Sequence, residues 1–523
     1  MESKISNEDD QFVNIGNNYS KRRSAQRNEI GTEKEEVQKK VWNLIKKACE
    51  EEGIQYQDHK LNLKNLKLDF GYYGDYGLEV LTEYEIPSLE SLKLNWDQLS
   101  DEGLKTLFGK TSWPKLKELD LKDNIIGVKE ILALSQGNLW TNLTTIDLSE
   151  NNICDEAAAE LSKNSSWTEL TTLKLAENNI KAEGAAELGK NNSWKNLTTL
   201  NLSRNEIGAG ATALSNNNSW TRLTTLILEQ NDIDDEGAKG LSKNASWVNL
   251  ATLDLAKNII GDEGAVGLSK NSSWTDLTKL LLSDNKIGAK GATVLGDNSS
   301  WIKLSTLGLS RNSIGAEGAR GLSKNSSWTN LTTLYLASNN ISDGGAHGLS
   351  SNESWTKLAS LDLSSNNINA EGAAALSANT SWTNLSSLDL EENYIGAEGA
   401  IALSKNKTWT KLTKLNLTAN NIGVQGAAAL GKNESWAELT ILDLNRNEIG
   451  DGGAIGLGEN SSWINLSKLY LSENNIHAEG AKGLSRNVAW TKLTTLSLIK
   501  NHIGTEGAAA LSKRWSSIHC NVE

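Results

Sequence analysis

The sequence predicts an α/β solenoid, in which copies of one short unit stack into a parallel sheet that helices cover on one side. The first observation is a tryptophan that recurs every 27 residues from Trp113 to Trp490, with a single 26-residue step between Trp194 and Trp220. The second is that apolar and polar residues keep the same order between successive tryptophans. A fixed period of about 20 to 50 residues is typical of a solenoid, in which each unit buries its apolar face against its neighbours.

Each unit contains one predicted strand and one predicted helix. In the unit that ends at Trp194, Leu173 and Leu175 alternate with polar residues, which indicates a short strand with one buried face. Residues 182–188 change to small helix formers, and Glu183 falls in the first turn, where a carboxylate complements the helix dipole. We expect the tryptophan to fill the layer between helix and sheet.

Asparagines recur at two fixed places in the unit. One follows each predicted strand, from Asn124 to Asn501, and its amide can both donate to and accept from backbone groups that a buried turn leaves without partners. The other opens Asn-x-Ser/Thr triplets such as residues 164–166. Because these triplets recur at a fixed position, repeat geometry explains them without glycosylation.

The pattern Leu-x-x-Leu-x-Leu-x-x-Asn-x-Ile, followed by a Gly-Ala-x-x-Leu helix, closely resembles the leucine-rich repeat. It looks most like the ribonuclease-inhibitor-like subtype, which the sensor arrays of intracellular immune receptors also use. The resemblance covers roughly residues 63–513, or about 17 units; it departs from that subtype in a slightly shorter unit and in a tryptophan that replaces the second helical leucine. Parallel strands stack about 4.8 Å apart whereas packed helices need roughly 8 to 10 Å, so the array should bend into a horseshoe with the sheet on its concave face and the helices on its convex face.

The two ends differ from the repeats. We predict a disordered polar tail over residues 1–31, a capping helix and lead-in over 32–62, the solenoid over 63–513 and a short tail over 514–523. Thr32 and Glu35 form a predicted capping box at the start of the capping helix. The C-terminal end has little to cover its last strand, which leaves end-to-end self-association open.

Composition excludes several classes of function. The net charge of −13 argues against nucleic acid as a partner, because phosphates require a basic face. The three cysteines are far apart and support neither a disulfide framework nor a zinc site. No secretory signal or membrane span is visible, so we expect a cytoplasmic protein, with delivery into a host cell left open if the source is an intracellular bacterium.

No catalytic motif or cofactor site is visible. The five histidines share no metal-ligand spacing, and the glycine-rich segments recur in nearly every unit, where they open helices. The sequence therefore predicts a protein that is not an enzyme and needs neither metal nor cofactor.

The concave wall of the predicted horseshoe carries the candidate binding residues. Tyr335, Asp362 and Asp389 occupy the same strand position in three successive units, so their side chains should lie in a line. Acidic and aromatic residues follow Asp389 directly: Glu391, Glu392 and Tyr394. Aromatic side chains beside carboxylates are typical of protein interfaces that receive a basic partner, although ordinary solvated polarity is the competing interpretation.

Two further clusters lie near the N-terminal end. The first is acidic: Asp120, Asp123, Asp147 and Glu150. The second is aromatic and competes with simple packing of the cap: Phe70, Tyr72, Tyr73, Tyr76 and Trp96.

These observations favour a non-enzymatic scaffold that binds a protein partner on its concave face. One alternative is a regulator of a small GTPase, because Ran GTPase-activating proteins look similar in repeat type, although they carry an acidic C-terminal tail that this chain lacks. The other alternative is a self-assembling structural protein. An immune sensor or ligase would need a nucleotide-binding or catalytic domain, for which the residues before the first repeat leave no room.

Overall fold

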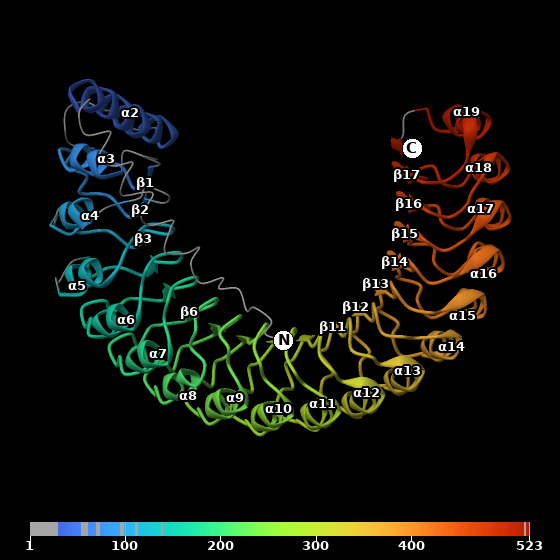
Figure 1. Cartoon of the computed structure of the whole chain (residues 1–523), viewed down its shortest axis with the longest axis horizontal. Helices are drawn as coiled ribbons and strands as arrows, with labels where there is room; N and C mark the ends of the chain where they lie inside the picture. The colour runs from blue at the N-terminus through green and yellow to red at the C-terminus, as the bar shows by residue number, and fades with distance from the viewer. Residues whose placement is uncertain are drawn as a thin grey trace, which may run out of the picture. The chain divides into compact units, whose positions relative to one another are not determined.

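The computed structural model describes residues 30–53, 61–68, 74–94, 99, 101–109, 113–136, 140–516 and 519–521. The chain divides into two compact units, Met1–Asn152 and Ile153–Glu523. In each unit, short parallel strands alternate with helices along the chain (Figure 1). The predicted solenoid of strand–helix repeats is confirmed, and the seventeen strands from β1 to β17 match the number of units expected.

The first unit begins with the longest described helix. Its elements are α2 (Ile30–Glu51), β1 (Asn65–Leu68), α3 (Gly74–Leu81), β2 (Ser91–Leu94), α4 (Asp101–Phe108), β3 (Glu118–Asp120), α5 (Val128–Gln136) and β4 (Thr145–Asp147). Val41 and Ile45 of α2 are buried, so one face of this helix is packed against the fold. The predicted capping box is wrong, because α2 begins at Ile30 and Thr32 therefore lies inside the helix.

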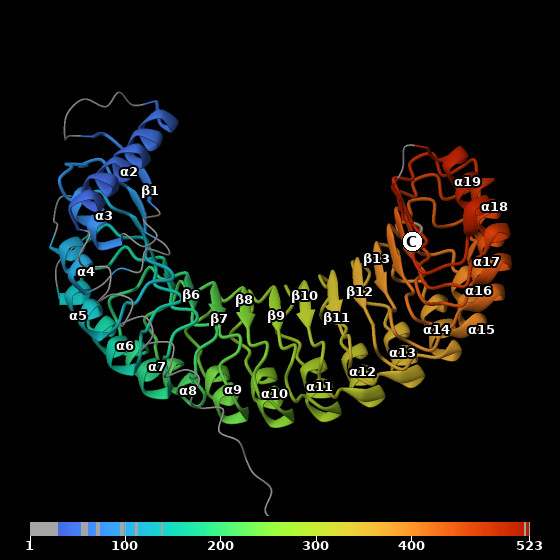
Figure 2. The same ribbon diagram turned by 45° about the horizontal axis from the view of Figure 1, so that its top comes forward.

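The second unit repeats the strand–helix pair to the C-terminal end. Its elements are α6 (Asp155–Ser162), β5 (Thr172–Lys174), α7 (Ala182–Leu188), β6 (Thr199–Asn201), α8 (Gly210–Leu214), β7 (Thr225–Ile227), α9 (Asp235–Ser242), β8 (Thr252–Asp254), α10 (Asp262–Ser269), β9 (Lys279–Leu281), α11 (Ala289–Gly296), β10 (Thr306–Gly308), α12 (Gly315–Ser323), β11 (Thr333–Tyr335), α13 (Ser342–Ser350), β12 (Ser360–Asp362), α14 (Ala370–Ala378), β13 (Ser387–Asp389), α15 (Gly396–Ser404), β14 (Lys414–Asn416), α16 (Gly423–Leu430), β15 (Ile441–Asp443), α17 (Gly450–Gly458), β16 (Lys468–Tyr470), α18 (Ala478–Ser485), β17 (Thr495–Ser497), α19 (Gly504–Arg514) and β18 (His519–Asn521). Within this unit the strands line the inner, concave side and the helices the outer, convex side (Figure 2).

The strands of the second unit pair so that equivalent residues lie side by side. Thr306 of β10 pairs with Thr333 of β11, one 27-residue step later, and the shorter step appears as the pairing of Thr199 with Thr225. In most strands the middle residue is a buried leucine and the two outer residues are partly exposed on the concave face. Each strand position therefore forms a continuous line of side chains across the sheet.

The tryptophans fill the layer between helices and sheet. Every one from Trp167 to Trp490 is fully buried, which confirms that this line of residues belongs to the core. From Trp194 to Trp490 the buried indole N–H groups have no hydrogen-bond partner among the described residues. The repeat therefore uses the volume and apolar surface of the ring rather than its polar atom.

Both lines of asparagines bind backbone groups between repeats. Asn151 donates to the carbonyl oxygens of Leu121 and Leu148, each at 3.0 Å, and accepts from the N–H of Ile126 at 3.0 Å. Asn191, in the second line, donates to Asn164 O at 2.9 Å and accepts from Trp194 N at 3.0 Å. The predicted structural role of the first line is confirmed, and the second line accounts for the Asn-x-Ser/Thr triplets.

The C-terminal end is better covered than the sequence suggested. Trp515 stacks on Trp490 with ring centroids 6.3 Å apart, and Arg514 donates to Asn487 O at 2.8 Å. Strand β18 pairs with β17 in parallel, so the edge of β17 is covered and the last described edge is β18, which has three residues as β17 does. A short edge strand is a poor template for pairing with another chain.

None of the helices in the described part of the chain combines the length and the apolar character needed to cross a bilayer.

Candidate functional site

Tyr335, Asp362 and Asp389 lie side by side on the concave face of the second unit, as predicted. Each is the third residue of its strand, and the register pairs Tyr335 of β11 with Asp362 of β12, and Asp362 with Asp389 of β13. Their alignment follows directly from the 27-residue spacing.

The same line continues for three more strands beyond the predicted residues. Asp389 pairs with Asn416 of β14, Asn416 with Asp443 of β15, and Asp443 with Tyr470 of β16. The 27-residue period leads from Asn416 to Asp443 and then to Tyr470, so the sequence alone could have identified these two residues. We call the six residues the tyrosine–aspartate row: Tyr335, Asp362, Asp389, Asn416, Asp443 and Tyr470.

The row ends abruptly on both sides. The residue before Tyr335 in this line is Gly308, and the residue after Tyr470 is Ser497. Three aspartates and an asparagine are thus enclosed by two tyrosines, and small residues follow on either side. The tyrosine at the β11 end is 40% exposed, so its ring is accessible from the concave side.

Asn416 connects the carboxylates at the centre of the row. Its side-chain nitrogen donates to Asp389 Oδ2 at 3.2 Å and to Glu391 Oε2 at 3.0 Å. Lys414 Nζ lies 3.8 Å from Asp389 Oδ2. Burial raises the pKa of Asp389 and the pKa of Glu391, and these hydrogen bonds oppose the rise.

One oxygen of each aspartate stabilises the turn that follows its strand. Asp389 Oδ1 accepts from the N–H of Glu391 at 3.1 Å, and Asp362 Oδ1 accepts from the N–H of Ser364 at 3.0 Å. Asp254 makes the same contact with Ala256 at 3.0 Å, outside the row. The turn thus explains an aspartate or asparagine at this position, and in Asp389 the second oxygen, Oδ2, accepts from the side chain of Asn416.

The predicted residues after Asp389 lie on the loop at the rim of the sheet. Glu392 has a positive φ of 53° and accepts from Ser365 Oγ at 2.8 Å. Tyr394 donates its backbone N–H to Ile368 O at 2.8 Å, and its side chain is 58% exposed. Glu391 is shared between this loop and the row, because Asn416 holds it beside Asp389.

The structure describes the N-terminal acidic cluster but not the side chains of the aromatic cluster. In the acidic cluster, Asp120 and Asp147 are register partners on β3 and β4, and Glu150 forms an ion pair with Lys122 at 2.7 Å. Asp123 lies on the loop after β3 with a φ of 57°. In the aromatic cluster, Phe70, Tyr72, Tyr73, Trp96 and the side chain of Tyr76 lie outside the described residues.

Two histidines that share no motif in the sequence are brought together. The rings of His477 and His502 have centroids 5.4 Å apart, and His477 Nδ1 lies 3.8 Å from Asp451 Oδ2. Within the described ranges, however, no group of three or more potential ligands is arranged to hold a metal ion. Asp451 already caps helix α18, because it accepts the N–H groups of His477 and Gly480.

The sequence matches the model of a known protein family. The family model described as "Leucine Rich repeat" matches thirteen segments that together cover more than half of the chain: residues 141–162, 168–189, 195–215, 221–242, 248–269, 275–296, 329–350, 356–377, 383–404, 410–431, 439–458, 464–485 and 491–512. No curated protein matches the chain in sequence.

Several solved structures resemble the chain at low sequence identity. An internalin from Listeria monocytogenes is 20% identical over 80% of this chain and 93% of its own, with a TM-score of 0.45. The TLR13 chain of the TLR13–ssRNA13 complex is 21% identical over 88% of this chain and 65% of its own, with a TM-score of 0.50. A leucine-rich repeat protein of Leptospira interrogans is 19% identical over 84% of this chain and 91% of its own, with a TM-score of 0.46. Identities this low show a shared fold alone.

Proposed function

Because the chain belongs to the leucine-rich repeat family, we propose that it is a non-enzymatic scaffold that binds a protein partner on the concave face of the second unit. The observation that carries the proposal is the tyrosine–aspartate row, which occupies six adjacent strands in register. A pre-formed sheet binds without ordering its own backbone, which lowers the entropic cost of association.

We propose a basic segment as the partner's contact. The row and its rim carry Asp362, Asp389, Glu391 and Asp443, and Lys414 forms an ion pair with Asp389. Tyrosine rings at the ends of such a row can pack on the aliphatic part of lysine or arginine and attract the cation itself. Aromatic residues are also enriched among those that contribute most to binding at interfaces.

We also propose the ribonuclease-inhibitor-like subtype and a cytoplasmic location for this chain. The helix that follows each strand supports the ribonuclease-inhibitor-like subtype, whereas its short length departs from that subtype. The thiols of Cys49 and Cys154 are free, which is typical of a reducing compartment and supports a cytoplasmic location. Neither regulation of a small GTPase nor end-to-end self-association gains a specific supporting observation in the described part of the chain.

The test compares partner capture by the parent chain and by the variant Tyr335→Ala/Asp362→Asn/Asp389→Asn. Asparagine already occupies the same strand position at residues 201 and 416, so the change removes charge without altering the repeat. A partner captured from cytosol should then be purified and titrated calorimetrically. We expect the variant to bind it about 30-fold or more weakly, the loss typical of removing interface residues that contribute most to affinity.

The matched control is Asp254→Asn, which makes the same change at the same strand position outside the row. It should bind like the parent, and circular dichroism should show both variants folded. Higher salt should weaken binding by the parent, because the proposed contact is electrostatic. A partner that the triple variant retains would contradict the proposed site, and the absence of any partner would contradict the scaffold function.

A further inference from the structure

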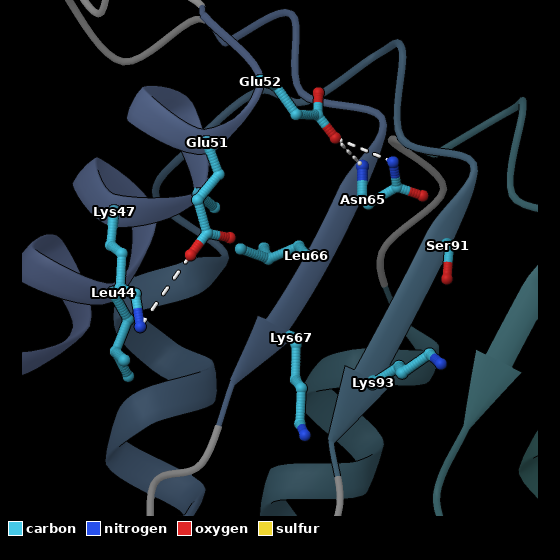
Figure 3. A pocket seen from close by; sticks show the side chains of 10 residues that line it. Leu44, Lys47, Glu51, Glu52, Asn65, Leu66, Lys67, Ser91 and Lys93 are labelled. Carbon is cyan, nitrogen blue, oxygen red and sulfur yellow. Dashed lines mark hydrogen bonds and ion pairs between the residues drawn. The ribbon is translucent and has the colours of Figure 1, made fainter.

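The first unit contains a cavity between helix α2 and the strands β1 and β2. Its volume is about 500 Å³. Helix α2 contributes Leu44, Lys47, Ala48 and Glu51, and the two strands contribute Asn65, Leu66, Lys67, Ser91 and Lys93, with Glu52 between them (Figure 3). Cavities of about 300 to 1,000 Å³ are the usual size for sites that bind small molecules or short segments.

Two lysines from neighbouring strands are among the residues that line this cavity. Lys67 of β1 and Lys93 of β2 are register partners, so their backbones lie about 4.8 Å apart. This is the one register pair between two cations among the described strands. Like charges placed directly opposite one another destabilise a sheet unless something neutralises them.

The carboxylates around the cavity are engaged elsewhere. Glu52 accepts from the N–H groups of Lys64 and Asn65 at 3.0 and 2.8 Å, and Glu51 forms an ion pair with Lys47 at 3.8 Å. In Figure 3 no dashed line joins Lys67 or Lys93 to either glutamate.

The neighbour of Lys93 on its other side does not neutralise it either. Asp120 of β3 is in register with Lys93, and its Oδ1 accepts the backbone N–H of Lys122 at 3.1 Å. The lining carries three lysines and two glutamates, so its formal charge is +1, and neither Lys67 nor Lys93 has a described carboxylate within ion-pair distance.

We propose that this cavity binds a phosphate monoester, with Lys67 and Lys93 contacting the phosphate. A monoester carries a charge of about −1.5 to −2 at neutral pH and has three acceptor oxygens, so one phosphate can accept from both ammonium groups and attracts them more strongly than a singly charged carboxylate. The wall formed by Leu44, Ala48 and Leu66 provides apolar surface for the organic part of the ligand. This site is independent of the tyrosine–aspartate row, because it lies in the other compact unit.

The test is calorimetric titration of the full chain with phenyl phosphate, inorganic phosphate and benzoate. Phenyl phosphate should bind at least about tenfold more tightly than benzoate, because benzoate has a similar ring and a single charge. Its affinity should fall as the pH is lowered through about 6, where the monoester loses its second charge. Weaker binding of inorganic phosphate would assign the site to an organic monoester, and equal binding would assign it to the free anion.

The variant Lys67→Gln/Lys93→Gln should weaken binding of phenyl phosphate about tenfold or more, because two charge-assisted contacts are lost. Both side chains are exposed, so the variant should fold normally. The matched control is Lys279→Gln on β9, an exposed strand lysine whose register partner is Thr306. Unchanged affinity in the double variant, or equal affinity for all three probes that depends only on ionic strength, would overturn the proposal.

Discussion

The concave face of the second unit has two regions that share one core but differ in surface. From β7 to β10 the third strand residues are Ile227, Asp254, Leu281 and Gly308, so one carboxylate lies between two aliphatic side chains. From β11 to β16 the same position forms the tyrosine–aspartate row. Beneath both regions the leucines and tryptophans are fully buried. The repeat therefore constrains the buried half of each strand and leaves the concave half free to specify a partner.

Two aspartates show what the difference in surroundings does. Burial raises the pKa of Asp254 and the pKa of Asp389, and in both a backbone N–H opposes the rise. Only Asp389 also receives a hydrogen bond from a neighbouring side chain, that of Asn416. In the row, Asn416 thus connects the carboxylates of Asp389 and Glu391, whereas Asp254 accepts a hydrogen bond from the backbone of its own turn.

The largest expected effect is the loss of stability when a core tryptophan is replaced. It tests whether the core is packed in the same way in both regions. Trp274 precedes β9, Trp382 precedes β13, and both are fully buried. Replacing either with alanine should lower the free energy of unfolding by about 3–5 kcal/mol, because a large cavity remains. Urea unfolding followed by circular dichroism should give similar losses for the two variants. A difference of more than about 1 kcal/mol would show that the regions are packed differently.

The matched control for each is the substitution to phenylalanine. Neither indole N–H has a hydrogen-bond partner among the described residues, so phenylalanine loses volume but no hydrogen bond. Trp274→Phe and Trp382→Phe should each cost less than half as much as the alanine variants. An equal cost would mean that the indole nitrogen contributes to stability.

The fold was predictable because the 27-residue period places every equivalent residue in one line. Trp328 and Asn339 could be assigned to the core and to the turn from position alone, and the structure confirms both. The same arithmetic placed Tyr335 beside Asp362. It also places Asp443 beside Tyr470, beyond the three strands of the predicted site.

Other contacts could not be predicted because they depend on geometry between repeats. The proximity of His477 to His502 arises from residues 25 apart, not 27, on loops that follow successive strands. The cavity under α2 depends on how that helix packs against β1, which no repeat specifies. Asn416 could be placed in the row from the period, but its bridge between Asp389 and Glu391 depends on side-chain conformation.

A smaller effect distinguishes two ways in which the helices begin. After β9, helix α11 is capped from the preceding repeat, because Asp262 accepts the N–H groups of Gly288 and Gly291 at 2.8 and 2.7 Å. After β13, helix α15 has no such aspartate and begins at Gly396 with a φ of +63°. We expect Asp262→Ala to cost about 1 kcal/mol through loss of the cap, and Gly396→Ala about 1–2 kcal/mol through backbone strain.

A second substitution can convert one kind of helix start into the other. Ala370 lies one repeat after Asp343, which accepts the N–H groups of Asn369 and Gly372. Adding Ala370→Asp to Gly396→Ala should therefore recover part of the lost stability, measured by the same unfolding experiment. No recovery would show that the start of α15 cannot adopt the extended conformation seen in α14.

The smallest expected effect concerns the pH dependence of the two aspartates. A carboxyl group whose pKa is higher in the folded than in the unfolded chain destabilises the fold when it is charged. Asp254→Asn should therefore raise the free energy of unfolding at pH 7, by less than about 1 kcal/mol. This gain should shrink as the pH falls through the raised folded pKa and vanish below the unfolded value near about 3.9. Asp389→Asn should gain less at pH 7, because it also loses the hydrogen bond from Asn416. Thermal unfolding of both variants between pH 3 and 7 measures this difference. A larger gain in stability at position 389 would mean that repulsion among the carboxylates of the row outweighs the hydrogen bonds that connect them.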